Sequence, residues 1–222
     1  MTPVVFDLDG TLIHSAPDIH DAANNVLSEL ELEPLSLEAV TSFIGNGVPK
    51  LIERVMRARN VDPSKHAELV LEFHRFYDPN PTRLTRPYPG VVETLEALRK
   101  QRIPLGLCTN KPTAPTIGIL RALDLEKYFD VLVCGDTLDV RKPDPAPLRQ
   151  AFAQMGAKTG IYVGDSEIDA ETADRADVTF LLFEGGYRKS AIVDLVYSAS
   201  FSDFGQVPEL VEARSHPEMA KA

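Results

Sequence analysis

The segment Val4–Ser15, with the sequence VVFDLDGTLIHS, places two aspartates directly after a short apolar run. Residues i and i+2 of a β-strand point the same way, so Asp7 and Asp9 can share one site while Leu8 points into the core. Two carboxylates this close repel each other, and a divalent cation is the natural remedy. The segment therefore predicts a buried strand that delivers two acids to a functional site.

The composition is that of a folded globular protein. The chain has 222 residues, of which 44% are hydrophobic and 25% are charged. Its formal net charge of −10 argues against general nucleic-acid binding and against binding to an anionic membrane. No apolar run is long enough to span a bilayer, and the N-terminus lacks a signal-peptide pattern. Cys108 and Cys134 lie in apolar runs, which favours buried, reduced thiols in a cytoplasmic protein over a disulfide.

Short apolar runs alternate with longer amphipathic segments over much of the chain. Continuous apolar runs are typical of strands buried on both faces, and five are expected here: Val4–Leu8, Ile103–Cys108, Val131–Cys134, Ile161–Val163 and Val178–Phe183. Helical spacing predicts four helices between them: Gly90–Arg102, Thr113–Leu123, Pro145–Met155 and Ile168–Ala176. This alternation predicts an α/β fold, a Rossmann-like core in which a parallel sheet carries helices on both faces.

One interval interrupts the alternation. Residues 14–85 contain no good strand candidate and show helical patterns instead, at Ile19–Leu30, Leu37–Phe43, Pro49–Arg59 and Lys65–Tyr77. We interpret residues 14–85 as a helical domain inserted after the first strand, so that residues 1–13 and 86–222 form the core domain. The tail after Val207 is polar and is predicted to be helical or frayed.

Polar residues follow four of the predicted strands. Ligands bind at the carboxyl ends of the strands in open parallel sheets, so these segments are expected to meet. They are Asp7-Leu8-Asp9-Gly10-Thr11, Thr109-Asn110-Lys111, Gly135-Asp136 with Arg141-Lys142-Pro143-Asp144, and Gly164-Asp165-Ser166-Glu167-Ile168-Asp169. Each segment alone has a simpler explanation, as a turn, a helix cap or a solvated loop. Their joint occurrence favours one catalytic site.

Taken together, these segments resemble the motifs of the haloacid dehalogenase-like superfamily. DLDGT, LCTN, RKP and GDSEID match its four motifs at Asp7, Asp9 and Thr11, at Thr109, at Lys142, and at Asp165 and Asp169. The resemblance covers essentially the whole chain, and it implies that residues 14–85 are the helical cap of that superfamily. Within it, FDLDGTLIHSAPDI, FIGNGVPKLIERV and CGDTLDVRKPDPAPL are most similar to phosphoglycolate phosphatases.

The resemblance implies a Mg²⁺-dependent hydrolase that acts on a small phosphorylated metabolite, with 2-phosphoglycolate as the first expectation. Asp7 would be the nucleophile that forms an aspartyl-phosphate, and Asp9 would move protons for the leaving alcohol and the water. The expected Mg²⁺ ligands are the Asp7 and Asp165 side chains and the Asp9 backbone carbonyl, with Asp169 acting through water or on Asp165.

Cations and hydrogen-bond donors are expected around the phosphoryl group. Lys142, Thr109 and the backbone N–H groups near Asn110 would hold its oxygens as charge develops. In the inserted helices, a glycine-rich turn precedes a basic helix and could contact the distal carboxylate of the substrate. The candidates are Gly45, Asn46, Gly47 and Lys50, with Arg54 as a further cation. The alternative is an ordinary turn between two helices.

Two other functions stay open at this point. A sugar phosphomutase of the same fold would share all four motifs, and a non-catalytic binding module would share the fold alone. Release of free phosphate, as opposed to an isomeric sugar phosphate, separates the first alternative from a phosphatase. We expect a monomer or a homodimer. His14 and Asp177 stand where similar proteins often carry Asp and Gly, so His14 concerns specificity and Asp177 only a helix end.

Overall fold

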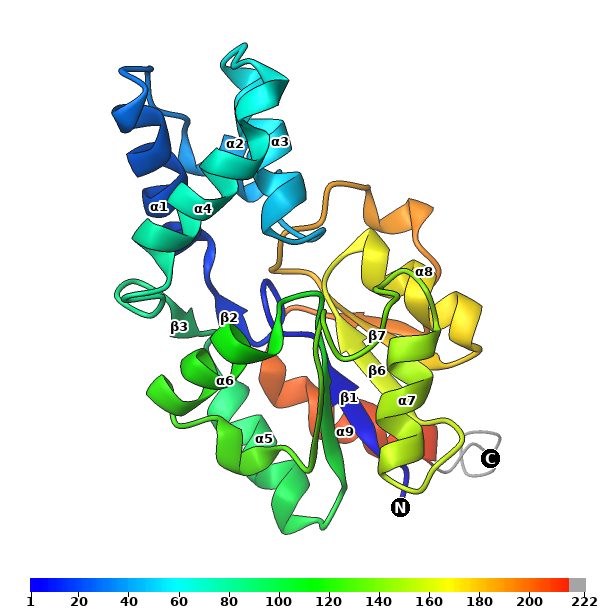
Figure 1. The fold of residues 1–222 in the computed structure, drawn as a ribbon. Helices are drawn as coiled ribbons and strands as arrows, with labels where there is room; N and C mark the ends of the chain where they lie inside the picture. Colours follow the sequence, from blue (N-terminus) through cyan, green and yellow to red (C-terminus); the bar gives the residue numbers. More distant parts are fainter. Residues whose placement is uncertain (216–222) are drawn as a thin grey trace.

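The structure is a computed structural model that describes residues 1–215, and a six-stranded parallel sheet forms its centre (Figure 1). The strand order is β5-β4-β1-β6-β7-β8. The strands are Val131–Val133 (β5), Leu105–Cys108 (β4), Val4–Phe6 (β1), Ile161–Gly164 (β6), Thr179–Phe183 (β7) and Ala199–Phe201 (β8). β1 pairs with both β4 and β6, so the DLDGT segment leaves the sheet at its centre.

Helices cover both faces of the sheet, as the alternating pattern predicts. The side chains of Val4 and Phe6 belong to one apolar cluster and that of Val5 to another, because successive strand residues face opposite sides. One face packs against α5 (Val91–Lys100), α6 (Thr113–Ala122) and α9 (Val207–Ser215), and the other against α7 (Ala146–Gln154) and α8 (Glu167–Ala176). Figure 1 shows α5 and α6 on one side of β1 and α7 and α8 on the other.

Residues 16–77 form four further helices at one end of the molecule (Figure 1). They are α1 (Ala16–Glu29), α2 (Leu37–Thr41), α3 (Val48–Ala58) and α4 (His66–Tyr77), and they pack around an apolar cluster of their own. The chain enters and leaves this unit through a two-stranded antiparallel ribbon of β2 (Ile13–His14) and β3 (Arg86–Pro87). The placement of these helices agrees with the insertion; the domain boundaries at residues 13 and 85 stay a prediction.

The remaining elements are short, and most deviations from the predicted bounds are small. Four 3₁₀ turns lie at Pro63–Lys65, Glu126–Tyr128, Ile192–Asp194 and Phe204–Gln206. α1 begins three residues before the predicted Ile19, since Pro17 fits the first turn of a helix, where its missing N–H costs nothing. The sequence pattern does not predict β8. The expectation of a helix after Val207 is confirmed by α9, but this helix is not polar throughout, because Val207 and Val211 are buried in the core.

Two predictions about the chain as a whole concern the state of its cysteines and the absence of a membrane-spanning helix. Cys108 and Cys134 are both buried and unpaired, which confirms the prediction of free thiols. None of the helices within residues 1–215 combines the length and the apolar character that a membrane crossing needs. Residues 216–222, the last part of the predicted tail, lie outside the described residues.

Candidate active site

The first motif forms a tight turn at the end of β1. The sheet ladder continues one residue beyond the strand, where the Asp7 N–H donates to the Val163 carbonyl at 2.9 Å. The chain then turns at Gly10, whose φ is +92°. A Cβ atom on Gly10 would lie 2.6 Å from Oδ2 of Asp165. Only glycine therefore suits this position, both for its backbone angle and because Asp165 approaches so closely.

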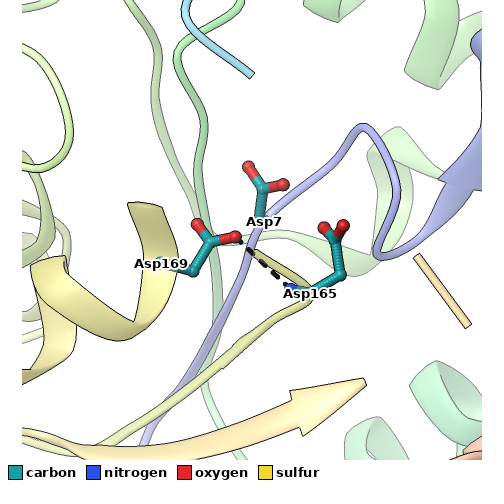
Figure 2. A group of neighbouring side chains, drawn as sticks. All are labelled: Asp7, Asp165 and Asp169. Atoms are coloured by element: carbon teal, nitrogen blue, oxygen red, sulfur yellow. Dashed lines mark hydrogen bonds between the residues drawn. The ribbon is translucent and has the colours of Figure 1, made fainter. Parts of the chain in front are cut away.

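Three buried carboxylates meet beside this turn. Asp7, Asp165 and Asp169 each offer one oxygen, and these oxygens lie within 4.8 Å of one another. Figure 2 shows the three side chains pointing to the same side, with Asp7 following β1, Asp165 in the connection after β6, and Asp169 in the first turn of α8. Oxygen-only sites of this kind suit hard divalent cations. The cluster could therefore hold a metal ion.

Asp165 is held at both carboxylate oxygens. The Thr11 hydroxyl donates to Oδ1 at 2.8 Å, and the Tyr187 backbone N–H donates to Oδ2 at 2.6 Å. Burial raises the pKa of Asp165 well above its ordinary value, and the neighbouring charges of Asp169 and Asp7 add to this effect. The two donors fix the orientation of the carboxylate but do not compensate its charge, so a nearby cation would favour its ionised form.

Asp169 is both a helix cap and a member of the acidic cluster. It forms a capping box with Ser166 at the start of α8, and the Ser166 hydroxyl donates to its Oδ2 at 2.6 Å. Its Oδ1 accepts from Lys142 at 2.7 Å and from the Tyr162 hydroxyl at 2.6 Å. Burial opposes ionisation, but the charge of Lys142 and the hydrogen bonds from Lys142, Ser166 and Tyr162 together lower the pKa of Asp169. The explanation of GDSEID as a helix start is therefore confirmed, and its functional role stays a prediction.

Lys142 supplies the buried positive charge of the site. Its Nζ lies 2.7 Å from Oδ1 of Asp7, 2.7 Å from Oδ1 of Asp169 and 2.8 Å from the Tyr162 hydroxyl. Burial alone would lower the pKa of Lys142, but the two carboxylates raise it, so the lysine is charged. Burial raises the pKa of Asp7 to about 7, although Lys142 counteracts this. One lysine thus does not neutralise the acids around Asp7.

Asp9 has a different set of neighbours from Asp7. The Ser15 hydroxyl donates to its Oδ1 at 2.5 Å, and Lys111 Nζ lies 3.3 and 3.4 Å from its two oxygens. Lys111 also donates to the Tyr77 hydroxyl at 3.0 Å. Tyr77 belongs to α4, so this contact joins the inserted helices to the strand end. Asp7 and Asp9 therefore stand side by side, each with its own lysine.

Thr109 and Asn110 lie at the end of β4, as predicted. The Thr109 hydroxyl accepts a hydrogen bond from the Lys111 backbone N–H at 3.2 Å. The Asn110 side chain donates to the carbonyls of Gly45 and Lys142, at 3.1 and 3.0 Å. Asn110 therefore ties the glycine-rich turn of the inserted helices to the loop that carries Lys142.

A cavity of about 90 Å³ lies over these residues. Its floor consists of the acids together with Thr109, Asn110, Lys111 and Lys142, and its apolar wall includes Ile19, Leu51 and Phe73 from the inserted helices. A single water needs roughly 10–15 Å³ by the same kind of measure, so the cavity has room for a small metabolite or several waters. Its size and mixed lining suit a small substrate with a charged head group.

The predicted substrate residues of the inserted helices divide into two pairs. Gly45 and Gly47 line the cavity, whereas Asn46 and Lys50 do not. Asn46 Oδ1 accepts from Arg54 at 2.8 Å. Lys50 is largely exposed and its Nζ meets Glu53 at 2.7 Å, because residues three apart share one face of α3. This geometry gives no support to Lys50 as a substrate ligand, and the role of Gly45 and Gly47 stays a prediction.

Some residues at the site were not candidates in the sequence analysis. Tyr162, which contacts Lys142 and Asp169, lies within a strand and has the pattern of a core residue, so no signal marked it. Tyr187 holds Asp165 through its backbone N–H, which a side-chain pattern cannot reveal. Lys111 did carry a signal, since it follows Thr109 and Asn110 at a strand end and so shares their edge of the sheet.

The two unusual positions have different consequences. Asp177 is the C-cap of α8 with a φ of 57°, so it ends a helix as predicted. His14 lies in the β2–β3 ribbon, where its Nδ1 is 3.1 Å from the Tyr187 hydroxyl. That hydroxyl also accepts from the backbone N–H of Ala16 at the start of α1, at 2.9 Å. His14 thus packs at the junction between the ribbon and the first inserted helix.

Comparison with known proteins gives a consistent result. The model of the haloacid dehalogenase-like hydrolase family matches residues 4–183. A phosphoglycolate phosphatase of Cereibacter sphaeroides (strain ATCC 17025 / ATH 2.4.3) is 48% identical over 213 residues, which cover 95% of this chain and 98% of that protein. One of Rhodobacter capsulatus is 37% identical over 94% and 96% of the two chains. The crystal structure of a predicted phosphoglycolate phosphatase from Haemophilus somnus 129pt matches with a TM-score of 0.90, 30% identity and coverage of 95% and 97%.

Proposed function

Because this chain belongs to the haloacid dehalogenase-like hydrolase family, we propose that it is a phosphatase that hydrolyses 2-phosphoglycolate to glycolate and phosphate. The substrate follows from the relatives that carry this activity in their names, which match nearly the whole chain at up to 48% identity. The observation that carries the reaction type is the meeting of Asp7, Asp165, Asp169 and Lys142 at the carboxyl edge of the sheet.

The acidic cluster fits a divalent cation, for which we propose Mg²⁺. All three side chains offer carboxylate oxygens, which are the ligands this ion prefers, and the charge of Asp165 has no cation among its hydrogen-bond donors. Asp7 and Asp165, with the Asp9 carbonyl, would hold the ion, and Asp169 would orient its surroundings. When bound, the ion would neutralise negative charge shared between the carboxylates and the phosphoryl oxygens.

Asp7 is the proposed nucleophile. One of its oxygens attacks phosphorus, a new oxygen–phosphorus bond forms, and the bond between phosphorus and the bridging oxygen of the substrate breaks. Lys142 contacts Asp7 at 2.7 Å and stabilises the negative charge that gathers there. We propose that Thr109 and the backbone N–H groups near Asn110 bind the phosphoryl oxygens, in keeping with their place on the cavity floor.

Asp9 is the proposed proton carrier. It gives its proton to the bridging oxygen as glycolate leaves, and it then takes a proton from the water that attacks phosphorus of the aspartyl-phosphate. This second attack breaks the bond to Asp7 and releases phosphate. The different neighbours of the two aspartates support these different roles. Ser15 and Lys111 contact the carboxylate of Asp9, whereas Lys142 contacts that of Asp7.

The proposal includes a setting for the reaction. The apolar wall of Ile19, Leu51 and Phe73 would exclude water once substrate is bound, which strengthens charge interactions inside. The free, buried thiols of Cys108 and Cys134 support a reducing compartment, and we expect the enzyme to act in the cytoplasm. The expectation of a monomer or homodimer stays a prediction.

A panel of small phosphomonoesters tests the proposal. The purified protein with Mg²⁺ is incubated with 2-phosphoglycolate, with aryl phosphates and with sugar phosphates, and released phosphate is measured. We expect the highest kcat/KM with 2-phosphoglycolate. The alternative of a phosphomutase requires an isomeric sugar phosphate as the main product, so product analysis by NMR on the same samples distinguishes it. Preference for a substrate without a carboxylate would contradict the proposed substrate.

A further inference from the structure

Lys111 is a buried lysine at the site. The proposed reaction assigns it no contact with the substrate. Lys111 lies in the connection from β4 to α6, and its side chain is 10% exposed. Its Nζ contacts the Tyr77 hydroxyl at 3.0 Å and the two oxygens of Asp9 at 3.3 and 3.4 Å. An ammonium group has three donors, and these long contacts to Asp9 are weak ones. Lys111 can therefore donate to a further acceptor in the cavity that it lines.

The other lysines near the cavity are less suited to a second anion. Lys142 is committed to Asp7 and Asp169, both at 2.7 Å. Lys50 lies outside the lining and is paired with Glu53. Lys189 does line the cavity, but its Nζ lies 3.4 Å from the Ile44 carbonyl oxygen and does not contact Asp9. Lys111 is thus the lysine that stands next to the proposed proton carrier.

The covalent structure of the substrate limits the distance between its carboxylate and its bridging oxygen. In 2-phosphoglycolate the carboxylate carbon is two bonds from the bridging oxygen, and Asp9 must reach that oxygen to protonate it. A group beside Asp9 therefore stands beside the substrate's carboxylate as well. The apolar wall of Ile19 and Phe73 makes the surroundings poorly screening, so a charge–charge contact there is strong.

We propose that Lys111 binds the carboxylate of the substrate and thereby sets the preference for phosphomonoesters with an anion next to the bridging carbon. This inference rests on the proposed function. It places recognition of the substrate's carboxylate in the core domain, at Lys111, and not in the inserted helices, where Lys50 was the sequence-based candidate. The Tyr77 hydroxyl and the Tyr77 ring, whose centroid lies 5.0 Å from Lys111 Nζ, hold the ammonium in place. Recognition thereby requires α4 to be in position.

The test compares two substrates of the same length. 2-Phosphoglycolate carries a carboxylate where 2-hydroxyethyl phosphate carries a hydroxymethyl group, and the ratio of their kcat/KM values measures charge recognition alone. We expect a high ratio in the wild type. Lys111→Met keeps most of the packing of the lysine stem but loses its charge, so the ratio should fall about ten- to a hundredfold. Lys111→Arg keeps a charge and should retain most of the ratio.

Two control variants locate the effect. Lys189→Met removes a cavity lysine that has no contact with Asp9, and Lys158→Met removes an exposed lysine near the opposite edge of the sheet. Both should leave the ratio within about twofold of the wild type. Circular dichroism verifies folding, and Lys111→Gln, whose amide can still donate to Asp9, replaces Lys111→Met if the latter does not fold.

The outcomes separate this inference from the proposed function. Equal losses for both substrates in Lys111→Met would overturn it, because Lys111 would then act on Asp9 only. A fall of the ratio in Lys189→Met but not in Lys111→Met would overturn it as well. A wild-type ratio near 1 would contradict the proposed substrate itself, whereas a high wild-type ratio that survives in Lys111→Met would contradict the role of Lys111 alone.

Discussion

At the scale of single residues, the fold gives different neighbours to two aspartates that the sequence places two positions apart. Asp7 lies among Lys142 and the other acids, and Asp9 lies with Ser15 and Lys111. The strand geometry explains why both side chains point the same way, but it does not explain why their neighbours differ. Apart from Ser15, these neighbours come from three distant parts of the chain, around Lys111, Lys142 and Asp165–Asp169, so only the folded protein distinguishes the surroundings of the two aspartates.

The role of Asp7 gives the first prediction. Asp7→Asn should lower kcat at least about a thousandfold, because an amide is a poor nucleophile of nearly the same size and the fold has no reason to change. Phosphate release from 2-phosphoglycolate and circular dichroism measure the two effects. Asp174→Asn, on the exposed side of α8, is the matched control and should keep full activity. A folded Asp7→Asn protein with more than a few per cent of wild-type activity would exclude Asp7 as the nucleophile.

The acidic cluster gives the second prediction. Removal of divalent cations with a chelator should abolish activity, and added Mg²⁺ should restore it, since Lys142 alone does not compensate the acids around Asp7. Ca²⁺ should fail to restore activity, because its larger and looser coordination would misplace the nucleophile. Activity is assayed after dialysis and titration with each ion. Undiminished turnover in thoroughly chelated protein would refute a metal-dependent mechanism.

At the scale of elements, glycine positions decide how closely segments approach. A Cβ on Gly186 would lie 2.3 Å from the Cβ and Oδ2 of Asp165, whereas a Cβ on Gly118 in α6 would meet nothing within 4 Å. The third prediction is that Gly186→Ala destabilises the fold by about 1–3 kcal/mol and weakens Mg²⁺ activation, because Asp165 must move. Gly118→Ala should be neutral or stabilise by up to about 1 kcal/mol.

Urea unfolding and Mg²⁺ titrations of activity measure both substitutions at these glycines. If Gly186→Ala left the Mg²⁺ requirement and the stability unchanged, the packing of this loop against Asp165 would be looser than the structure indicates. A destabilised Gly118→Ala protein would show that α6 has a neighbour on that face in solution.

The elements also show how far the sequence predicts the fold. Strands such as Val131–Cys134 and Val178–Phe183 are evident because burial on both faces makes them continuously apolar. β8, with the sequence ASF, lies at the edge of the sheet and has only three residues in a polar stretch, so hydrophobic pattern does not detect it. The two-residue strands of the β2–β3 ribbon are defined by pairing between distant segments, which no local pattern contains.

The candidate site follows the same division. Asp7, Asp165 and Lys142 are predictable because polar residues at the ends of parallel strands must meet at one edge of the sheet. The environment of Lys50 is not predictable in this way, because its direction depends on how α3 packs onto the other helices. The sequence places Lys111 after a strand and Lys50 near the start of an inserted helix. Only the tertiary structure shows that Lys111 lines the cavity, whereas Lys50 lies at the surface and pairs with Glu53.

At the scale of the whole molecule, two apolar clusters cover the sheet and a third lies within the inserted helices. The cavity of the candidate site lies between the sheet and that third cluster. Contacts such as Asn110 to Gly45 and Lys111 to Tyr77 cross this boundary through side chains of the site itself. The position of the inserted helices and the geometry of the site therefore depend on each other.

The segment that returns from the inserted helices to the core is fixed by one buried acid. Asp18 in α1 accepts hydrogen bonds from the Leu84 and Thr85 backbone N–H groups and from the Thr85 hydroxyl, with distances of 3.0 Å to Leu84 and 2.7 Å to each Thr85 donor. Asp18 and Thr85 are both buried. Asp21, one turn further along α1, meets Arg83 of the same segment at the surface, where both side chains are about half exposed.

The fourth prediction compares these two acids. Asp18→Ala leaves three donors without their acceptor, two of them on the buried Thr85, and should lower the free energy of unfolding by at least about 2 kcal/mol. Asp21→Ala removes only an exposed ion pair and should cost less than about 1 kcal/mol. Urea unfolding measures both changes. Since Asp18 fixes the segment that leads from the inserted helices into β3, Asp18→Ala should also raise KM for 2-phosphoglycolate, whereas Asp21→Ala should not. Equal stability losses for the two variants would mean that other residues fix the return segment. A destabilised Asp18→Ala protein with unchanged KM would show that the inserted helices are positioned over the cavity without the contacts of Asp18.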